Sequence, residues 1–452
     1  MSPPTPDAQR PFPVAGADRG RALRHGSRLD SYVDRYAERT HGMTASQIRA
    51  LFAVASRPEV VSLAGGMPTI ASLPLDVIGD QIAHLVREEG QSALQYGSGQ
   101  GDPRLREQIT EVMRTVGINA HPDDVVVTVG SQQALDLVTR IFIDPGDTIL
   151  VEAPSYVGAL STFRSYQASV HHVEMDEHGL VPGALREAIA SLAASGIRPK
   201  FLYTIPNFHN PAGVTQTAQR RREVLDIALE ADILVLEDDP YGMLGFDGEP
   251  PRAMRADTDD GVIYLGSFSK TFAPGLRVGW ALAPHAVREK LVLAAEASVL
   301  CPPTMNQRVV SNYLEQSDWL GQVKVFRELY RERRDAMLDA LDEQFPPGCH
   351  WTHPDGGFYV WLTLPEGLDS QAMLPRAVTD RVAYVPGTAF YADGFGSRSM
   401  RLSYCFPTPE RIREGVRRLA GVIEAELDLV HTFGPGHLSG RAGFGLPTPD
   451  MT

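Results

Sequence analysis

The sequence predicts an α/β protein with a large domain, built on a mostly parallel sheet flanked by helices, and a smaller α+β domain. Two observations predict it. Up to about residue 310, short β-branched runs that end in Gly, Pro, Asp or Ser alternate with helix-like segments, which is typical of a buried parallel sheet. Beyond that point, long charged helical segments precede an antiparallel-looking strand, which indicates a change of domain.

The expected elements follow in order along the chain. The expected strands of the large domain lie within residues 123–131, 147–155, 200–207, 232–240 and 262–270, and residues 132–142 are expected to form a helix. In the smaller domain, residues 319–341 are expected to form a helix and residues 356–364 an antiparallel strand. Ligands of such sheets bind at the carboxyl ends of the strands, so the polar residues that close these runs are candidates for a site.

The chain is expected to divide into five segments. Residues 1–28 are rich in Pro, Gly and Arg and predict a mobile arm, and residues 432–452 predict a flexible tail. Between them we expect a segment at 29–75 that contributes to the small domain and the active-site entrance, a large domain at 76–310 and a small C-terminal domain at 311–431.

The composition argues against several classes of partner. A formal net charge of -14 repels a polyphosphate backbone, so nucleic acid is not expected to bind. The cysteines Cys301, Cys349 and Cys405 form no CxxC pair, which argues against a disulfide framework or zinc site and favours a reducing, cytoplasmic setting. The N-terminus lacks the apolar region of a secretory signal, and no apolar run approaches ~18 residues, so no membrane span is expected.

Lys270 is the first candidate for catalysis. It lies in GSFSKTFAPGLRVGW, just past an expected strand, and only three other lysines exist, Lys200, Lys290 and Lys324. A lysine amine is nucleophilic only after losing its proton, which a buried cationic or apolar site promotes. The ordinary alternative is a solvated surface lysine, and the neighbouring hydroxyls and Arg277 argue against it.

Two segments are candidates for binding a phosphate. Two hydroxyls, Ser267 and Ser269, and the guanidinium of Arg277 suit a dianion. In GSQQAL, Ser131 and Gln132 follow Gly130 and place backbone N–H groups at an expected helix N-terminus, where an anion is stabilised. The alternatives are a strand-to-loop turn for the first segment and a simple helix cap by Ser131 for the second.

Two more segments suit an aromatic nitrogen heterocycle. In LVLEDDPYG, Asp238 at a strand end can pair with a protonated pyridine nitrogen, and Tyr241 can donate its hydroxyl to a ring oxygen. In PNFHNPAG, Asn210 is held extended by the following proline, so its amide can reach a ring substituent. Taken singly, the first segment is also explained as a loop start and the second as a turn.

Together these segments resemble the fold type I pyridoxal-phosphate aminotransferases of class I/II, and within them the α-aminoadipate and kynurenine aminotransferase branch. The matching strings run from about residue 45 to 425 and are SLAGGMP, LQYGSGQGDPRLREQI, VGSQQALDL, EAPSYVGAL, PNFHNPAG, EDDPYG, SFSKTFAPGLRVGW and MRLSYC. Each string is weak alone, but eight in the same order are specific. The resemblance implies a mostly parallel seven-stranded sheet in the large domain, and pyridoxal 5'-phosphate as the cofactor.

The resemblance also implies a role for each matching residue. Lys270 would bind the cofactor as a Schiff base and move a proton, and Asp238 would pair with the pyridine nitrogen. The ring oxygen would be bound by Asn210 and Tyr241, the ring face by Tyr156, and the phosphate by Ser131, Gln132, Ser267, Ser269 and Arg277. Tyr96 would reach the phosphate of a neighbouring subunit, which implies a homodimer, although core packing is the commoner role for Tyr96 and Tyr156. Arg401 would bind the substrate α-carboxylate, with the Gly66 backbone nearby and Asn210 also on the substrate side.

The function implied is transfer of an amino group from an α-amino acid to a 2-oxo acid, 2-oxoglutarate or pyruvate, by a ping-pong mechanism. The main alternative is another fold type I reaction, such as that of a lyase, decarboxylase, racemase or cyclising synthase. TIASLP after SLAGGMP departs from the family pattern and puts 2-aminoadipate itself in doubt.

Three further alternatives fit the sequence less well. A regulator with a fused DNA-binding domain needs roughly 60 or more residues for that domain, whereas only about 30 irregular residues precede the resemblance. YGSGQGD lacks the dinucleotide-binding pattern. VHHVEMDEH, which contains His171, His172, Glu174 and His178, is better explained by a half-exposed strand than by a metal site, so no metal is expected.

Overall fold

The computed structural model describes residues 32–43 and 57–434 of the chain. The chain separates into two units, residues 1–41 and 42–452. The described residues of the first include two short 3-10 turns, η1 (Val33–Arg35) and η2 (Glu38–Gly42), the second of which ends at the first residue of the larger unit. The predicted arm at 1–28 and nearly all of the predicted tail at 432–452 lie outside the described residues, and the boundaries predicted within the larger unit stay predictions.

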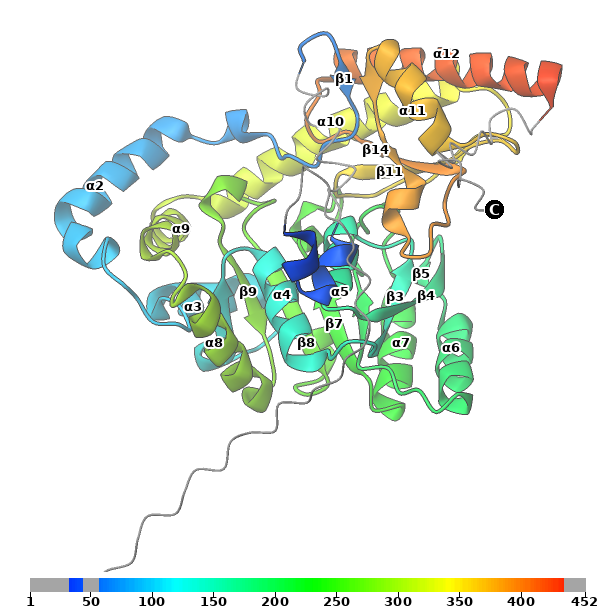
Figure 1. Cartoon of the computed structure of the whole chain (residues 1–452). Helices are drawn as coiled ribbons and strands as arrows, with labels where there is room; N and C mark the ends of the chain where they lie inside the picture. The colour runs from blue at the N-terminus through cyan, green and yellow to red at the C-terminus, as the bar shows by residue number, and fades with distance from the viewer. Residues whose placement is uncertain (1–31, 44–56, 435–452) are drawn as a thin grey trace, which may run out of the picture. The chain divides into compact units, whose positions relative to one another are not determined.

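An eight-stranded sheet forms the centre of the larger unit (Figure 1). In spatial order its strands are β2 (Val125–Thr128), β9 (Gly279–Leu282), β8 (Val262–Ser267), β7 (Leu234–Asp238), β6 (Phe201–Thr204), β3 (Thr148–Ala153), β4 (Ser169–Asp176) and β5 (Gly179–Leu180). Only β9 and β5 run against the others, so the prediction of a mostly parallel sheet is confirmed. The two-residue strand β5 extends the expected seven strands by one.

Helices and short 3-10 turns flank this sheet. The helices are α2 (Leu75–Ala93), α3 (Pro103–Arg114), α4 (Ser131–Phe142), α5 (Val157–Ser165), α6 (Pro182–Ala194), α7 (Ala218–Glu230), α8 (His285–Val299) and α9 (Thr304–Gln316). The turns are η3 (Ile70–Ser72), η4 (Pro122–Asp124), η5 (Gly242–Leu244), η6 (Met254–Asp257) and η7 (Pro274–Leu276). Within the described part of the chain, no helix has the length and apolar character needed to cross a membrane.

Alternating side chains of the central strands belong to two separate cores. In β3, Ile149 and Val151 pack in one apolar cluster with side chains of α4 and α5, while Leu150 packs in another with side chains of α6 and α7. Successive side chains of a strand point to opposite faces, so a strand that is apolar throughout must be covered on both. This is why the apolar runs of the sequence predicted a buried parallel sheet.

The second part of the larger unit is built on a four-stranded antiparallel sheet. Its strands, in spatial order, are β10 (His350–Trp351), β11 (Tyr359–Thr363), β14 (Ser399–Ser403) and β13 (Val385–Pro386), and a separate parallel pair joins β1 (Val61–Ser62) to β12 (Val382–Ala383). Its helices are α10 (Trp319–Gln344), α11 (Ser370–Thr379), the 3-10 turn η8 (Gly387–Phe390) and α12 (Pro409–Phe433). The helix predicted at 319–341 and the antiparallel strand predicted at 356–364 are confirmed.

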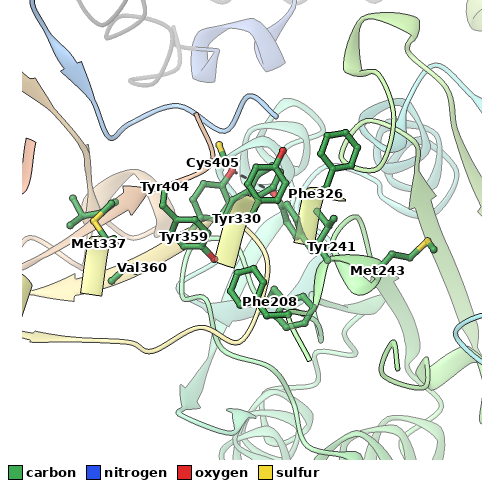
Figure 2. Close-up of a cluster of buried hydrophobic side chains, with 14 of the residues drawn as sticks. Phe208, Tyr241, Met243, Phe326, Tyr330, Met337, Tyr359, Val360, Tyr404 and Cys405 are labelled. Atoms are coloured by element: carbon green, nitrogen blue, oxygen red, sulfur yellow. Dashed lines mark hydrogen bonds between the residues drawn. The ribbon is translucent and has the colours of Figure 1, made fainter. Parts of the chain in front are cut away.

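One aromatic cluster joins the two parts of the unit (Figure 2). Tyr241 beside η5 packs edge-on against Phe358, which in turn packs against Tyr330 of α10. All three rings are buried and belong to the largest apolar core of the described residues. The loop after β7 is therefore fixed against the antiparallel sheet, and this contact defines one wall of the cavity described below.

A histidine makes a second connection between the two parts. Nδ1 of His172 in β4 lies 3.1 Å from the carbonyl of Glu152, and Nε2 accepts a hydrogen bond of 2.9 Å from the backbone N–H of Ala392. The predicted strand at this histidine-rich segment is confirmed as β4. The described residues contain no group of three or more side chains suited to hold a metal ion.

His172 predicts a loss of stability in acid. Burial lowers the pKa of His172 below its ordinary value, and protonated Nε2 would face the Ala392 N–H as a second donor. A lowered histidine pKa means that the unfolded chain binds more protons, so stability falls as the pH drops through about 6.5. We expect the melting temperature of wild type to fall relative to that of His172→Gln between pH 8 and pH 5. An equal change in both proteins would contradict this.

Candidate active site

A cavity of about 220 Å³ lies at the carboxyl ends of the parallel strands, beside the antiparallel sheet. Its lining comprises Gly66, Met67, Ser131, Tyr156, Ile205, Asn210, Asp238, Pro240, Tyr241, Lys270, Tyr359 and Arg401. Residues predicted from the sequence thus supply most of the wall, although they come from segments up to 335 positions apart in the chain, as Gly66 and Arg401 do. The parallel strands bring their carboxyl ends to one edge, as expected of such sheets.

Lys270 lies at this cavity, three residues after the end of β8. Its amine donates a hydrogen bond of 2.9 Å to the carbonyl of Gly66 and lies 5.5 Å from the ring centroid of Phe358. Burial, with a smaller contribution from the nearby guanidinium of Arg401, lowers the pKa of Lys270 to about 8. The free amine is therefore accessible close to neutral pH, which is the condition for a nucleophilic lysine.

Three consecutive acids, Glu237, Asp238 and Asp239, stand at the end of β7 and differ in their surroundings. Glu237 accepts the backbone N–H groups of Met254 and Arg255, and Asp239 accepts the N–H of Gly242. Asp238, the last residue of β7, is the acid of the three that lines the cavity. The strand alternation separates these neighbours, and it selects Asp238 as the residue available for a ligand.

Tyr203 of β6 is a functional neighbour that the sequence did not reveal. Its buried hydroxyl donates a hydrogen bond of 2.7 Å to Oδ2 of Asp238. Oδ1 is buried without a hydrogen-bond partner among the described residues. Burial raises the pKa of Asp238 to about 7, and the bond from Tyr203 acts in the opposite direction. A buried acceptor left open in this way suits a cationic N–H donor.

Asn210 and Arg401 are joined across the cavity. Nη1 of Arg401 donates 2.8 Å to Oδ1 of Asn210, and Nη2 donates 2.8 Å to the carbonyl of Ala64. Because Oδ1 is occupied, the amide of Asn210 has its N–H₂ group left as a donor to a ligand. Arg401 is buried, and its Nε has no hydrogen-bond partner among the described residues, so the guanidinium retains donors for an incoming carboxylate.

The start of α4 forms a cradle for an anion. Gly130 caps the helix with φ of 73°, and Ser131 is its first residue. A Cβ at Gly130 would lie 2.4 Å from Nη2 of Arg277, so only glycine lets this guanidinium approach the helix N-terminus. Arg277 itself has a left-handed backbone with φ of 53°. Backbone N–H groups and a guanidinium together suit a phosphate dianion.

Serine and glutamine side chains complete the surroundings of this cradle. Oγ of Ser269 lies 3.4 Å from Nη1 of Arg277, and Oγ of Ser267 accepts the N–H of Ser269 at 3.0 Å. The side-chain amide of Gln132 instead donates to Thr162 Oγ1 at 2.8 Å, and its Oε1 accepts from the Tyr156 hydroxyl at 3.3 Å. Gln132 can therefore offer its backbone N–H to an anion while its side chain orients Tyr156.

Tyr156 and Tyr96 differ in where the structure places them. Tyr156 lines the cavity, and burial raises its pKa to about 12, so its hydroxyl remains protonated. A Cβ at Gly158 would lie 2.4 Å from the Tyr156 ring, which explains the glycine there. Tyr96 is 77% exposed and does not line the cavity of its own chain. The role predicted for Tyr96 requires a second subunit and stays a prediction.

The comparison with known proteins decides the family. Residues 58–419 match the family model described as aminotransferase class I and II. The chain belongs to this aminotransferase family. An aromatic-amino-acid aminotransferase of Thermococcus litoralis is 43% identical over 399 residues, which are 88% of this chain and 95% of the relative. A 2-aminoadipate transaminase of Thermus thermophilus is 38% identical over 404 residues, covering 88% of this chain and 99% of the relative.

A solved structure extends this comparison to the fold. The kynurenine aminotransferase of Pyrococcus horikoshii, in complex with PMP, superposes with a TM-score of 0.85 at 39% identity and covers 89% of this chain and 100% of its own. The aminotransferase therefore has fold type I and depends on pyridoxal phosphate to transfer amino groups. These relatives do not favour the alternative of a lyase, decarboxylase, racemase or cyclising synthase.

The residues of this aminotransferase fit the cofactor. The unpartnered Oδ1 of Asp238 is an acceptor for a protonated ring nitrogen, and the amide of Asn210 is a donor for a ring oxygen. The cradle of Gly130 and Arg277 is built for a dianion. Lys270 supplies the amine. Each chemical group of pyridoxal phosphate thus has a matching partner in or beside one cavity.

Proposed function

We propose that this aminotransferase takes the amino group from aromatic and other apolar α-amino acids, and that the residues named above carry the reaction. The observation that carries the proposal is the cavity in which the Lys270 amine, the open Oδ1 of Asp238 and the buried guanidinium of Arg401 meet. When bound, pyridoxal phosphate supplies an electron-withdrawing ring that stabilises negative charge at the substrate Cα.

Lys270 would hold the cofactor and then act as the proton carrier. Its amine, with a pKa lowered to about 8, exchanges a proton readily near neutral pH. The carbonyl of Gly66, 2.9 Å away, gives the amine a partner when it is not bonded covalently. Lys270 would therefore take the proton from the substrate Cα as a general base and return it as a general acid.

Asp238, Asn210 and Tyr241 would fix the cofactor ring in its plane. The Tyr203 hydroxyl holds one carboxylate oxygen of Asp238 and leaves the other for the ring nitrogen. Tyr241 is buried at the cavity, and burial raises its pKa far above the usual value, so it stays a donor for the ring oxygen. Tyr156 would cover one face of the ring.

The phosphate would bind outside the ring site, at the N-terminus of α4. Ser131, Ser267, Ser269 and Arg277, with the backbone N–H of Gln132, offer donors from two segments of the large sheet. Because these segments are fixed by β2 and β8, the anion would anchor the ring in one orientation.

The substrate carboxylate would bind to Arg401, and the side chain would meet an apolar wall. Met67, Ile205 and Tyr359 line the cavity. Among the described lining residues, Lys270 and Arg401 are the only basic side chains, and the proposal uses both for other tasks. This favours an apolar side chain over one that bears a second carboxylate. The name of the Thermococcus litoralis relative supports an aromatic donor.

A donor panel tests this substrate class. We expect kcat/KM for phenylalanine or tyrosine to exceed that for aspartate or 2-aminoadipate by ~10-fold or more, since a carboxylate against an apolar wall is poorly solvated. The measurement is formation of the 2-oxo acid product, with 2-oxoglutarate and pyruvate as alternative acceptors. A preference for the acidic donors would refute the proposed substrate class.

We also propose a homodimer and a cytoplasmic location. Tyr96 is exposed, together with Leu94 and Leu300, as expected of residues that a second subunit covers. The free cysteines Cys301, Cys349 and Cys405 support a reducing compartment. Light scattering on the purified protein should give about twice the chain mass, and a monomer would remove the role proposed for Tyr96.

A further inference from the structure

Beyond its place on the apolar wall of the cavity, Tyr359 contacts both Arg401 and Tyr241. It begins β11 and is 2% exposed. We propose that Tyr359 is a positioning residue with two separable functions: its ring holds the guanidinium of Arg401, and its hydroxyl supports Tyr241. The inference rests on the proposed roles of Arg401 and Tyr241, and its test below distinguishes the failure of either.

The ring of Tyr359 lies against the substrate-binding arginine. Cζ of Arg401 is 4.2 Å from the centroid of this ring and 5.1 Å from that of Phe390. In the antiparallel pair of β11 and β14, Arg401 lies opposite Trp361, so Tyr359 is its diagonal neighbour on the sheet. A guanidinium between aromatic faces is attracted by their π electrons and loses rotational freedom. The ring therefore fixes the direction in which Arg401 presents its donors.

The hydroxyl of Tyr359 contacts Tyr241, the residue proposed to bind the ring oxygen of the cofactor. Oη of Tyr241 donates a hydrogen bond of 3.4 Å to Oη of Tyr359, and the two rings meet edge-on at 6.0 Å. A Cβ at Gly66 would lie only 2.3 Å from the Tyr359 hydroxyl, so the glycine leaves room for this oxygen. Figure 2 shows both tyrosines in the same buried cluster.

A hydroxyl group can accept and donate, so this pair can reverse direction. Once Tyr241 donates its hydrogen bond to the ring oxygen of a ligand, its own oxygen is left as an acceptor, and Tyr359 is the hydroxyl next to it. Burial raises the pKa of both tyrosines, so both keep their protons. Donation from Tyr359 would then strengthen donation from Tyr241, as in any chain of hydrogen bonds.

Two substitutions separate the two functions. Tyr359→Phe removes only the hydroxyl, and Tyr359→Met removes the ring while roughly keeping the volume. We expect Tyr359→Phe to raise the pH midpoint of the visible absorbance of the bound cofactor by roughly 0.5 unit, because the ring oxygen loses support. Tyr384→Phe is the matched control: it deletes a buried hydroxyl that bonds to the Ser370 carbonyl, away from the cavity, and should leave the midpoint unchanged.

A double variant tests whether Tyr359 acts through Tyr241. In a Tyr241→Phe background, adding Tyr359→Phe should leave the absorbance midpoint unmoved, since the intermediate donor is gone. If Tyr359→Phe shifts the midpoint as much in the Tyr241→Phe background as it does when Tyr241 is present, this function of the hydroxyl is overturned. If wild-type protein shows no visible absorbance from bound cofactor, the proposed function itself fails, which is a different result from an absorbance that Tyr359→Phe does not shift.

The ring function is tested by measuring the Kd of a simple carboxylate. We expect Tyr359→Met to raise the Kd of propanoate, which carries a carboxylate but neither an amine nor an aromatic side chain, on the order of 10-fold, and Tyr359→Phe to keep it within about 2-fold. The Kd is measured by titrating the cofactor absorbance. Equal weakening by Phe and Met would overturn the ring function. Should the Met variant not fold, Tyr359→Leu replaces it, with the same expected result.

Discussion

Lys270→Ala should lose on the order of 10⁴-fold or more in kcat, because the proton carrier and the covalent anchor of the cofactor disappear together. The protein should still fold, since among the described residues the Lys270 side chain is hydrogen-bonded only to the carbonyl of Gly66 and belongs to no apolar core cluster. The measurements are kcat with a saturating amino donor and the visible absorbance of the cofactor-supplemented protein.

Lys290→Ala is the matched control for this experiment. Lys290 is exposed on α8, away from the cavity, and its loss should leave both kcat and absorbance at wild-type values. Treatment with borohydride should attach the cofactor to Lys270 in wild type and to no residue in Lys270→Ala. A Lys270→Ala protein that turned over and kept the wild-type absorbance would refute the assignment of the site.

Asp238→Asn should have opposite effects on activity and on the stability of the apoprotein. With an amide in place of the carboxylate, the ring nitrogen loses its anionic partner, and kcat should fall on the order of 10²- to 10³-fold. The amide oxygen can still accept a hydrogen bond from the Tyr203 hydroxyl, so we expect the local structure to be retained. Single-turnover absorbance measurements would locate the loss in the chemical step.

The gain in stability follows from the sign of the pKa shift. Burial raises the pKa of Asp238 to about 7, so the folded apoprotein binds more protons than the unfolded chain between pH 4 and pH 7 and loses stability as the pH rises. Asn does not titrate, and the Asp238→Asn apoprotein should exceed wild type by roughly 2 kcal/mol at pH 8 and by little at pH 5. Denaturant titrations at the two pH values measure this, and a pH-independent difference would contradict it.

The sequence pattern indicated best those cavity residues that follow strands closely. Ser131, Asp238 and Lys270 all close apolar runs, and the rule that parallel strands end at one edge predicts that they lie together. Arg401 and Gly66 do not follow such a run in the large sheet. Their place in the site was implied by resemblance alone, because they belong to the antiparallel part and the segment around β1.

Tyr203 and Tyr359 show what the sequence pattern could not provide. Tyr203 lies inside an apolar strand and is indistinguishable there from a core residue, until β6 is known to pair with β7 and to place it beside Asp238. Tyr359 needs the register of β11 against β14 as well as the contact with Tyr241. Both depend on the pairing of strands that are distant in the chain, which periodicity does not encode. The antiparallel strand β9 was missed for the same reason.

The order of the strands also determines when a growing chain acquires its cofactor-binding groups and when it acquires its substrate-binding groups. In the large sheet β2 has β9 as its one partner. A growing chain therefore lacks any partner for β2 until about 150 further residues have been synthesised. The groups proposed for the cofactor are complete by Arg277, whereas Arg401 and the β12 partner of β1 come more than 100 residues later. A nascent chain would thus possess a phosphate cradle and an amine well before it could recognise an amino acid, with unpaired strands open to chaperones in between.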